Sequence, residues 1–257
     1  TIHYMAYANE HLAFNGPIAE ILTGQVSVMN ETHMFLNEHR EYGASLYDSH
    51  TDGSGVCYSS RLRPVLNMRP KHISALGGDG SSIWQFNADT HITDWLEAMG
   101  YGFDVIIDED LHYEGLELLK PYHVILTGTH PEYHSLEMWD AMKAYQNQGG
   151  RLMYLGANGW YWRIAFHRDC PGLMEIRRNE GGIRTWAAEP GEYYHSFTGE
   201  LGGMWRRMGR APQSVVGTGM AAQGFDYSCH YERTEASYDS RTAFIFDGIG
   251  DNEKIGD

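Results

Sequence analysis

Strand-like and helix-like segments alternate between residues 72 and 160, and this alternation most constrains the fold. Short apolar segments with the length and composition of strands lie at residues 72–76, 103–107, 122–127 and 151–155. A helical segment begins at Thr90, where the apolar residues Ile92, Trp95, Leu96 and Met99 follow the spacing of one helix face. This alternation is typical of βαβ units. We therefore expect an α/β fold with a mostly parallel sheet flanked by helices.

Capping and breaking residues place the other helix boundaries. A helix near residues 111–119 has to end before Pro121, because the residue that precedes a proline disfavours helical geometry. Another helix follows Ser135, a good N-cap residue, and carries Glu137 in its first turn. Two adjacent glycines at 149 and 150 predict its end.

The flanking parts of the chain have a different composition. Residues 1–71 and 161–257 are rich in glycine, aromatics and short alternating runs such as residues 243–246, which predict added β-rich segments and long loops. We interpret residues 1–257 as one catalytic domain, with an N-terminal segment (1–71), a parallel α/β core (72–160) and a β-rich continuation (161–257). We also expect a longer parent protein, because the chain starts at Thr1 without a methionine.

Charge and cysteine content narrow the classes of partner. A net charge of −15 disfavours nucleic acid and anionic membranes as partners. The apolar runs are far shorter than the roughly 20 residues of a membrane span. Cys57, Cys170 and Cys229 lie too far apart for a Cys-x-x-Cys motif, and their odd number argues against a disulfide framework. We expect a cytoplasmic protein.

Polar loops follow two consecutive strands of the predicted sheet, at residues 127–134 and 156–159. A right-handed crossover brings such loops to the same edge, where ligands bind in open parallel sheets. We therefore expect His130, Glu132 and Asn158 to share one crevice. Glu132 suits a metal ligand or a base, His130 a proton carrier and Asn158 a donor to a carbonyl oxygen. The alternative is that His130 and Glu132 only cap the helix that begins near Ser135.

Several familiar catalytic motifs are missing from the sequence. It has no Gly-x-Ser-x-Gly elbow, no dinucleotide fingerprint and no phosphate loop. The turn after residues 122–127 has no cysteine, which disfavours an amidotransferase nucleophile. His130, Glu132 and His134 leave a zinc site open, although their spacing is not that of a helical metalloprotease pair.

The sequence resembles the large subunit of N,N-dimethylformamidase over essentially its whole length. The stretches that carry this resemblance are residues 5–9, 46–48, 52–56, 58–64, 128–133, 149–156, 158–159 and 161–163. The resemblance implies hydrolysis of N,N-dimethylformamide to dimethylamine and formate. It also implies a fold similar to that of class I glutamine amidotransferases, pairing with a small subunit and a homo-oligomer.

The same resemblance implies a mononuclear Fe³⁺ held by two tyrosine phenolates and one carboxylate. The matching positions are Tyr7, Tyr47 and Glu132, with Tyr4 close enough to Tyr7 to remain an alternative. His130 and Asn158 match polar residues near the metal. A free tyrosine has a pKa near 10, so a phenolate at neutral pH needs a strong cation to displace its proton.

Two other functions stay open at this point. The chain is a non-catalytic binding or assembly module if Tyr7 and Tyr47 serve only for packing, which is the commonest role of tyrosine. It is a hydrolase of another substrate if zinc binds His130, Glu132 and His134. Metal identity separates these cases from the iron-dependent amide hydrolase.

Overall fold

The computed structural model describes residues 2–9, 18–20, 26–28, 31–48, 50, 52, 54–68, 86–156, 158–178, 190–220 and 229–256. The chain divides into two compact units. The larger unit comprises Thr1–Ala19 and Val26–Met220, and the smaller comprises Glu20–Gln25 and Ala221–Asp257. The predicted boundaries at residues 71 and 160 stay a prediction.

A mixed five-stranded sheet is centred on β7 (Trp162–Phe166). Its order is β3 (Tyr58–Ser60), β8 (Leu173–Ile176), β7 and β5 (Tyr133–His134), and β9 (Gly203–Met204) also pairs with β7. Only β5 runs parallel to β7, whereas β8 and β9 are antiparallel to it. The chain is therefore an α/β protein, but a mostly parallel sheet is not confirmed, and the amidotransferase-like fold stays a prediction.

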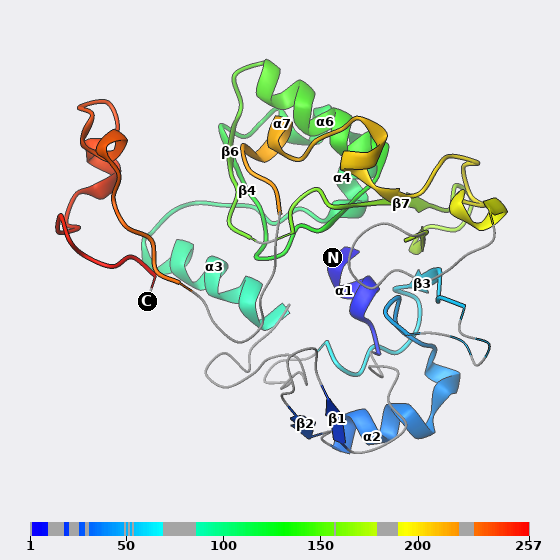
Figure 1. The fold of residues 1–257 in the computed structure, drawn as a ribbon. Helices are drawn as coiled ribbons and strands as arrows, with labels where there is room; N and C mark the ends of the chain where they lie inside the picture. The colour runs from blue at the N-terminus through cyan, green and yellow to red at the C-terminus, as the bar shows by residue number, and fades with distance from the viewer. Residues whose placement is uncertain are drawn as a thin grey trace. The chain divides into compact units, whose positions relative to one another are not determined.

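The predicted parallel strand pair around the 135–147 helix is present. β4 (Val124–Leu126) pairs in parallel with β6 (Arg151–Met153), and α6 (Leu136–Asn147) lies between them in sequence (Figure 1). The Ser135 Oγ accepts a hydrogen bond from the Met138 N–H at 3.3 Å. Ser135 is thus the helix N-cap, as its residue type predicted.

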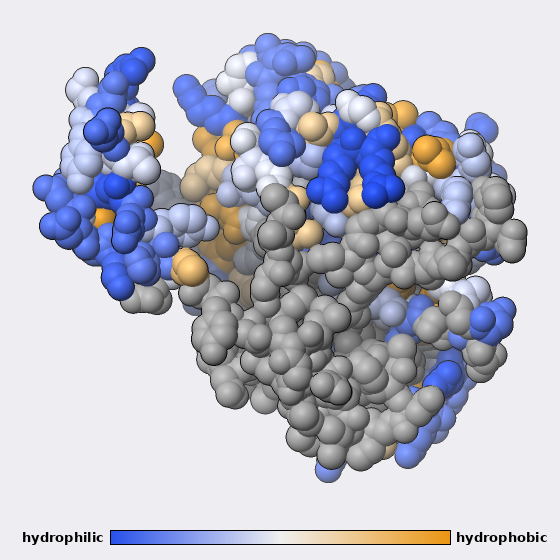
Figure 2. Space-filling model, viewed as in Figure 1, coloured by the Kyte–Doolittle hydropathy of each residue, from blue (hydrophilic) through white to orange (hydrophobic). Residues whose placement is uncertain are grey.

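β4 and β6 are only partly buried. Ile125 and Leu152 pack against the core, while Val124 and Met153 are 39% and 43% exposed. Figure 2 shows apolar surface in orange over the region where Figure 1 places these strands. Alternate residues of a strand face opposite sides, so the pair is packed on one face. The strand within residues 122–127 is therefore only partly buried.

The remaining elements include most of the predicted helices. The helix from Thr90 is α3 (Phe86–Ala98), and the helix near residues 111–119 is divided at Gly115 (φ 61°) into α4 (Asp108–Glu114) and α5 (Leu116–Leu119). The others that lie before residue 221 are α1 (Ile2–Tyr7), β1 (Ile18–Glu20) paired with β2 (Val26–Val28), α2 (Glu31–Glu38), η1 (Arg40–Tyr42), η2 (Pro190–Tyr193), η3 (Trp205–Met208) and α7 (Gln213–Val216).

Two predicted strands are not formed, and one lies outside the described residues. Residues 103–107 form no strand, and Val105 is 71% exposed. Residues 243–246 form a 3-10 helix, η5 (Ala243–Phe246), instead of a strand. A strand needs a partner for its backbone groups, and an apolar run does not reveal whether one is available. Residues 72–76 are outside the described part of the chain.

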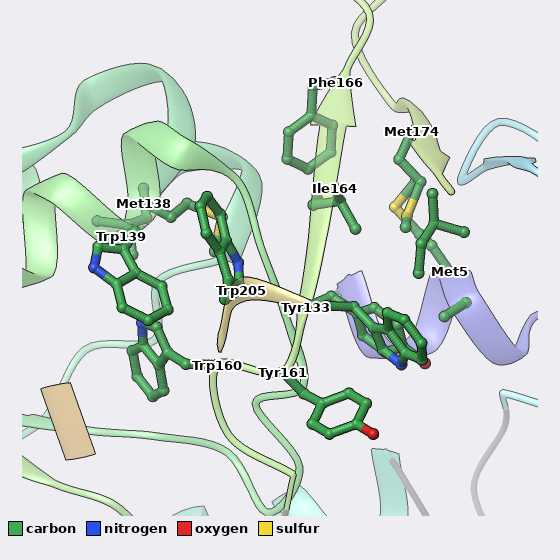
Figure 3. Close-up of a cluster of buried hydrophobic side chains, with 14 of the residues drawn as sticks. Met5, Tyr133, Met138, Trp139, Trp160, Tyr161, Ile164, Phe166, Met174 and Trp205 are labelled. Atoms are coloured by element: carbon green, nitrogen blue, oxygen red, sulfur yellow. The ribbon is translucent and has the colours of Figure 1, made fainter. Parts of the chain in front are cut away.

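The core of the larger unit lies on both sides of β7, all five residues of which are buried. Figure 3 shows Met138, Trp139 and Trp205 beside α6, and Met5 and Met174 on the other side of the strand. Trp139 and Trp205 are tilted against each other with ring centroids 5.0 Å apart. Large aromatic side chains supply much of a core's buried area.

The smaller unit is organised around Arg233. Its guanidinium lies 4.1 Å from the Tyr238 ring centroid and 4.9 Å from that of Phe246, and it donates to the Ile249 carbonyl. These contacts join η4 (Glu235–Tyr238) to η5. Of the apolar residues at 243–246, Phe246 therefore packs on the Arg233 cation, whereas Phe244 and Ile245 are exposed.

Candidate metal centre

The turn that carries Tyr47 is held against α1. The Leu46 N–H donates to the Ala6 carbonyl at 2.9 Å, and the Ser45 N–H donates to the Asp48 carboxylate at 2.7 Å. The Tyr47 N–H donates to the Ser45 Oγ at 3.1 Å. Such side-chain to main-chain bonds define a tight turn. They place Tyr47 next to Tyr7, whose ring stacks on it with centroids 4.2 Å apart.

Glu132 directly precedes β5, and main-chain hydrogen bonds from the start of β7 hold it in place. Its carbonyl accepts hydrogen bonds from the Tyr161 N–H at 3.0 Å and the Trp162 N–H at 2.9 Å. The side chain is only 4% exposed. Burial of a carboxylate is costly unless it is paired or hydrogen-bonded. Glu132 therefore needs the partners that surround it.

The Tyr47 hydroxyl connects the stacked rings of Tyr7 and Tyr47 to Glu132. The Tyr47 hydroxyl lies 3.3 Å from both Glu132 carboxylate oxygens, and it hydrogen-bonds to the Tyr133 hydroxyl. Tyr7, Tyr47 and Glu132 thus meet although they come from α1, the 45–48 turn and the loop before β5. Two phenols and a carboxylate form an all-oxygen donor set of the kind that hard cations prefer.

Arg178 supplies the positive charge of this cluster. It is 0% exposed, and its guanidinium lies 4.1 Å from the Tyr47 ring centroid and 5.3 Å from that of Trp162. It donates to the Leu46 carbonyl and, at 3.4 Å, to the Tyr133 hydroxyl. A buried guanidinium near a buried carboxylate offsets part of the cost of burying each charge.

Burial favours the protonated forms of Tyr47 and Tyr133 in the absence of a metal ion. Burial and the neighbouring Glu132 raise the pKa of Tyr47 to about 12, although Arg178 acts in the opposite direction. Burial and Glu132 also raise the pKa of Tyr133 well above its usual value. A Tyr47 phenolate at neutral pH therefore requires a metal ion in addition to Arg178, and a highly charged ion displaces the proton most readily.

The structure places Tyr4 away from this cluster. The Tyr4 hydroxyl donates to the Asp89 carboxylate, and burial together with Asp89 raises its pKa. Asp89 also accepts from the Thr129 N–H at 2.6 Å and the Thr129 hydroxyl at 2.8 Å. Of the two candidate tyrosines in α1, Tyr7 is therefore the one that stacks on Tyr47.

His130 lies beside Glu132, as its position in the loop predicted. Its Nε2 is 3.4 Å from the Glu132 Oε2, and its side chain is largely buried. Ser135 is the N-cap of α6 and Glu137 is the acidic residue of its first turn, as predicted. The alternative that His130 and Glu132 serve only the helix end stays a prediction. The Glu132 carboxylate lies near Tyr47 and His130.

Asn158 lies on the neighbouring loop. The Trp160 N–H donates to the Pro131 carbonyl at 3.0 Å, so the loops at 127–134 and 156–159 are side by side, as predicted. Asn158 has a left-handed backbone (φ 55°), a conformation that asparagine tolerates better than most residues. Its role at the cluster stays a prediction.

The zinc hypothesis is wrong for the described residues. His134 stacks on Trp160 with ring centroids 4.1 Å apart, and burial lowers its pKa to about 4. Across the described ranges no three His, Cys, Asp or Glu side chains are grouped to hold a metal ion. His130, Glu132 and His134 do not form such a group, because His134 packs in the core.

Sequence reasoning missed Tyr133 and Arg178. Tyr133 follows Glu132 directly, and strand alternation puts neighbouring side chains on opposite faces, so nothing in the pattern marks both for one cluster. Arg178 is one of two adjacent arginines after β8, and Arg177 pairs with Glu175 at 2.7 Å instead. The basic pair was the only available signal, and it does not show which arginine is buried.

The fold and this cluster define an α/β protein with a largely buried cluster of three tyrosines, one carboxylate and one arginine. The chain belongs to the N,N-dimethylformamidase beta subunit-like, C-terminal family, whose model matches residues 1–257. It is 45% identical over 258 aligned residues to the N,N-dimethylformamidase beta subunit of Paracoccus aminophilus, and 44% identical to that of Alcaligenes sp. Each match covers 100% of this chain and 33% of the relative. The chain therefore spans about a third of these relatives' length.

None of the helices in the described part of the chain has the length and apolar character that spanning a membrane requires.

Proposed function

We propose that this chain carries the metal centre of an amide hydrolase that cleaves N,N-dimethylformamide and other small formamides to an amine and formate. The observation that carries the proposal is the convergence of Tyr7, Tyr47 and Glu132, with the Tyr47 hydroxyl 3.3 Å from both carboxylate oxygens. The two relatives are named as dimethylformamidase subunits, which supports this substrate class.

The donor set fits a ferric ion. Two phenolates and one carboxylate supply three negative charges, and Tyr47 keeps its proton until a strong cation replaces it. We assign Tyr7, Tyr47 and Glu132 as the residues that hold the ion. When bound, Fe³⁺ would polarise the amide carbonyl and make a hydroxide available near neutral pH.

The neighbouring polar residues take the remaining roles. His130 is placed beside Glu132 to carry a proton, and the departing amine requires one. Asn158, on the adjacent loop, would donate to the oxygen of the tetrahedral intermediate. Glu132 links metal binding to proton transfer, because it contacts both the ligand Tyr47 and the proton carrier His130.

Partner and location follow from the relatives and from the cysteines. Because the relatives are beta subunits, we propose a small partner subunit, and a homo-oligomer of the resulting pair. Cys57, Cys170 and Cys229 are free thiols, which suits the reducing cytoplasm.

The test is the iron content and visible spectrum of the full-length protein with its partner subunit. We expect stoichiometric iron with a phenolate-to-iron charge-transfer band that disappears in Tyr47→Phe, and dimethylformamide hydrolysis that disappears with it. Glu132→Gln should lose iron and activity together, and an active, iron-replete Glu132→Gln would contradict the ligand assignment.

Tyr145→Phe is the matched control. It also removes one hydroxyl from a buried tyrosine, but that hydroxyl donates to the Tyr122 carbonyl at 3.0 Å, outside the cluster. Iron and spectrum should stay native in Tyr145→Phe. A complete, folded protein without bound metal, in which Tyr47→Phe is harmless, would instead support the non-catalytic binding module.

A further inference from the structure

The direction of the hydrogen bond between Tyr47 and Tyr133 follows from their other partners. The Arg178 guanidinium carries only donors, so the Tyr133 oxygen must accept at that contact. The Tyr47 hydroxyl has a carboxylate acceptor within 3.3 Å, and a charged acceptor binds a proton more strongly than a neutral phenol does. Tyr47 therefore donates to Glu132, and Tyr133 donates to Tyr47.

The two tyrosines differ in their hydrogen bonds. The Tyr47 hydroxyl lies 3.3 Å from both Glu132 carboxylate oxygens, whereas the Tyr133 hydroxyl accepts from Arg178 at 3.4 Å and bonds to the Tyr47 hydroxyl. We therefore assign Tyr47 as the ligand and Tyr133 as its hydrogen-bond partner.

We propose that Tyr133 is a positioning residue of this centre, whose hydroxyl donates to the Tyr47 oxygen in a direction fixed by Arg178. The proposal rests on the metal centre proposed above. Arg178 contacts both tyrosines. Its guanidinium lies over the Tyr47 ring, donates to the adjacent Leu46 carbonyl and donates to the Tyr133 oxygen. If a bound metal ion displaced the Tyr47 proton to solvent, the Tyr47 oxygen would still accept the Tyr133 hydrogen bond.

The consequence is spectroscopic. A hydrogen bond to a phenolate oxygen lowers the energy of its electrons, so partners of a ligand tune the metal that it holds. Without the Tyr133 donor, transfer of an electron from the Tyr47 phenolate to iron would cost less energy, and the charge-transfer band would move to longer wavelength. A tyrosine that serves only packing leaves the band in place.

The experiment compares Tyr133→Phe with Tyr145→Phe in the full-length, iron-loaded protein with its partner subunit. We expect Tyr133→Phe to keep its iron and to shift the band to longer wavelength, while Tyr145→Phe keeps the native band. An unmoved band at full iron occupancy would overturn the proposal. Loss of iron in Tyr133→Phe would also overturn it, because Tyr133 would then be a ligand.

Arg178→Lys tests whether Arg178 fixes the direction of the hydrogen bond from Tyr133 to Tyr47. Lysine keeps the charge but lacks the planar fork that reaches two acceptors. We expect a band shift in the same direction as in Tyr133→Phe, and no further shift when both changes are combined. Additive shifts would show that Arg178 acts independently of Tyr133 and would refute its assigned role.

A metal-free measurement separates this inference from the proposed function. If the complete native protein takes up no iron, the proposed function fails, and the Tyr133 to Tyr47 hydrogen bond is tested by thermal unfolding. We expect the unfolding midpoints of Tyr47→Phe, Tyr133→Phe and the double variant to be non-additive, because both changes remove the same bond. Additive midpoints would overturn the inference.

Discussion

A methyl group added at Gly156 should force apart the two loops that carry the site. Gly156 follows β6, and a side-chain carbon built there would overlap the carbonyl group of Thr129 and lie 2.8 Å from the His130 nitrogen. These are main-chain atoms, so no side-chain rotation relieves the overlap. The backbone angle of Gly156 is not in the left-handed region, so crowding alone decides the outcome.

The expected cost of Gly156→Ala follows from overpacking. Inserting atoms into a closely packed region costs about 1–3 kcal/mol. For a domain of this size, each kcal/mol lowers the unfolding midpoint by about 2–4 °C. We therefore expect a midpoint lower by roughly 2–12 °C. Iron affinity should fall as well, because Thr129 and His130 lead directly into Glu132.

The assay is calorimetric unfolding of the full-length protein together with its iron content. Gly102→Ala is the matched control, because a methyl group there meets no atom within 4 Å and the residue has no left-handed backbone. Its midpoint should stay close to the native one. If Gly156→Ala unfolds at the same temperature as Gly102→Ala with native iron content, the close approach of the two loops is refuted.

Three further predictions concern single side chains. Tyr4→Phe should keep native iron content and spectrum, since its hydroxyl bonds Asp89, and a lost band would return Tyr4 to the ligand set. Asn158→Gly, which tolerates the φ of 55°, should keep iron but lower kcat about 100-fold or more as an oxyanion donor is lost, and an unchanged kcat would remove Asn158 from the mechanism. Burial lowers the pKa of His195 to about 4, below the unfolded value of about 6.5, so the unfolded state binds the extra proton and stability falls as pH drops from about 6.5 to 4. His195→Gln should flatten unfolding curves over that range by at most about 1.4 kcal/mol per pH unit, and an unaltered pH dependence would exclude this histidine.

The candidate site was predictable where it depends on local chain geometry. Ser135 caps α6 as its residue type predicted, and the β4–α6–β6 unit brings the loops with His130 and Asn158 together. Tyr7 and Tyr47 carried no such signal. Their assignment came from the family resemblance, because a tyrosine in a core and a tyrosine beside a metal have the same local pattern.

The sheet was less predictable than the helices. The apolar run at residues 103–107 has the composition of a strand, but a strand also needs a partner, and Val105 is exposed. The alternation at residues 243–246 predicted a strand, and Phe246 packs on Arg233 in a 3-10 helix instead. Helix caps act over three or four residues, whereas strand pairing depends on distant segments.

The sequence by itself determined the α/β class, the capped helix α6 and the loop that presents His130 and Glu132, because these depend on residues close together in the chain. Only the tertiary structure decided which α1 tyrosine faces Tyr47, and it alone revealed Tyr133 and Arg178. The physical reason is that each of these contacts depends on one polar group meeting a partner far away in the sequence. Tyr4 donates to a carboxylate 85 positions away, and Arg178 reaches Leu46 across 132 positions. The folded core brings these partners together, and no local pattern encodes their contact.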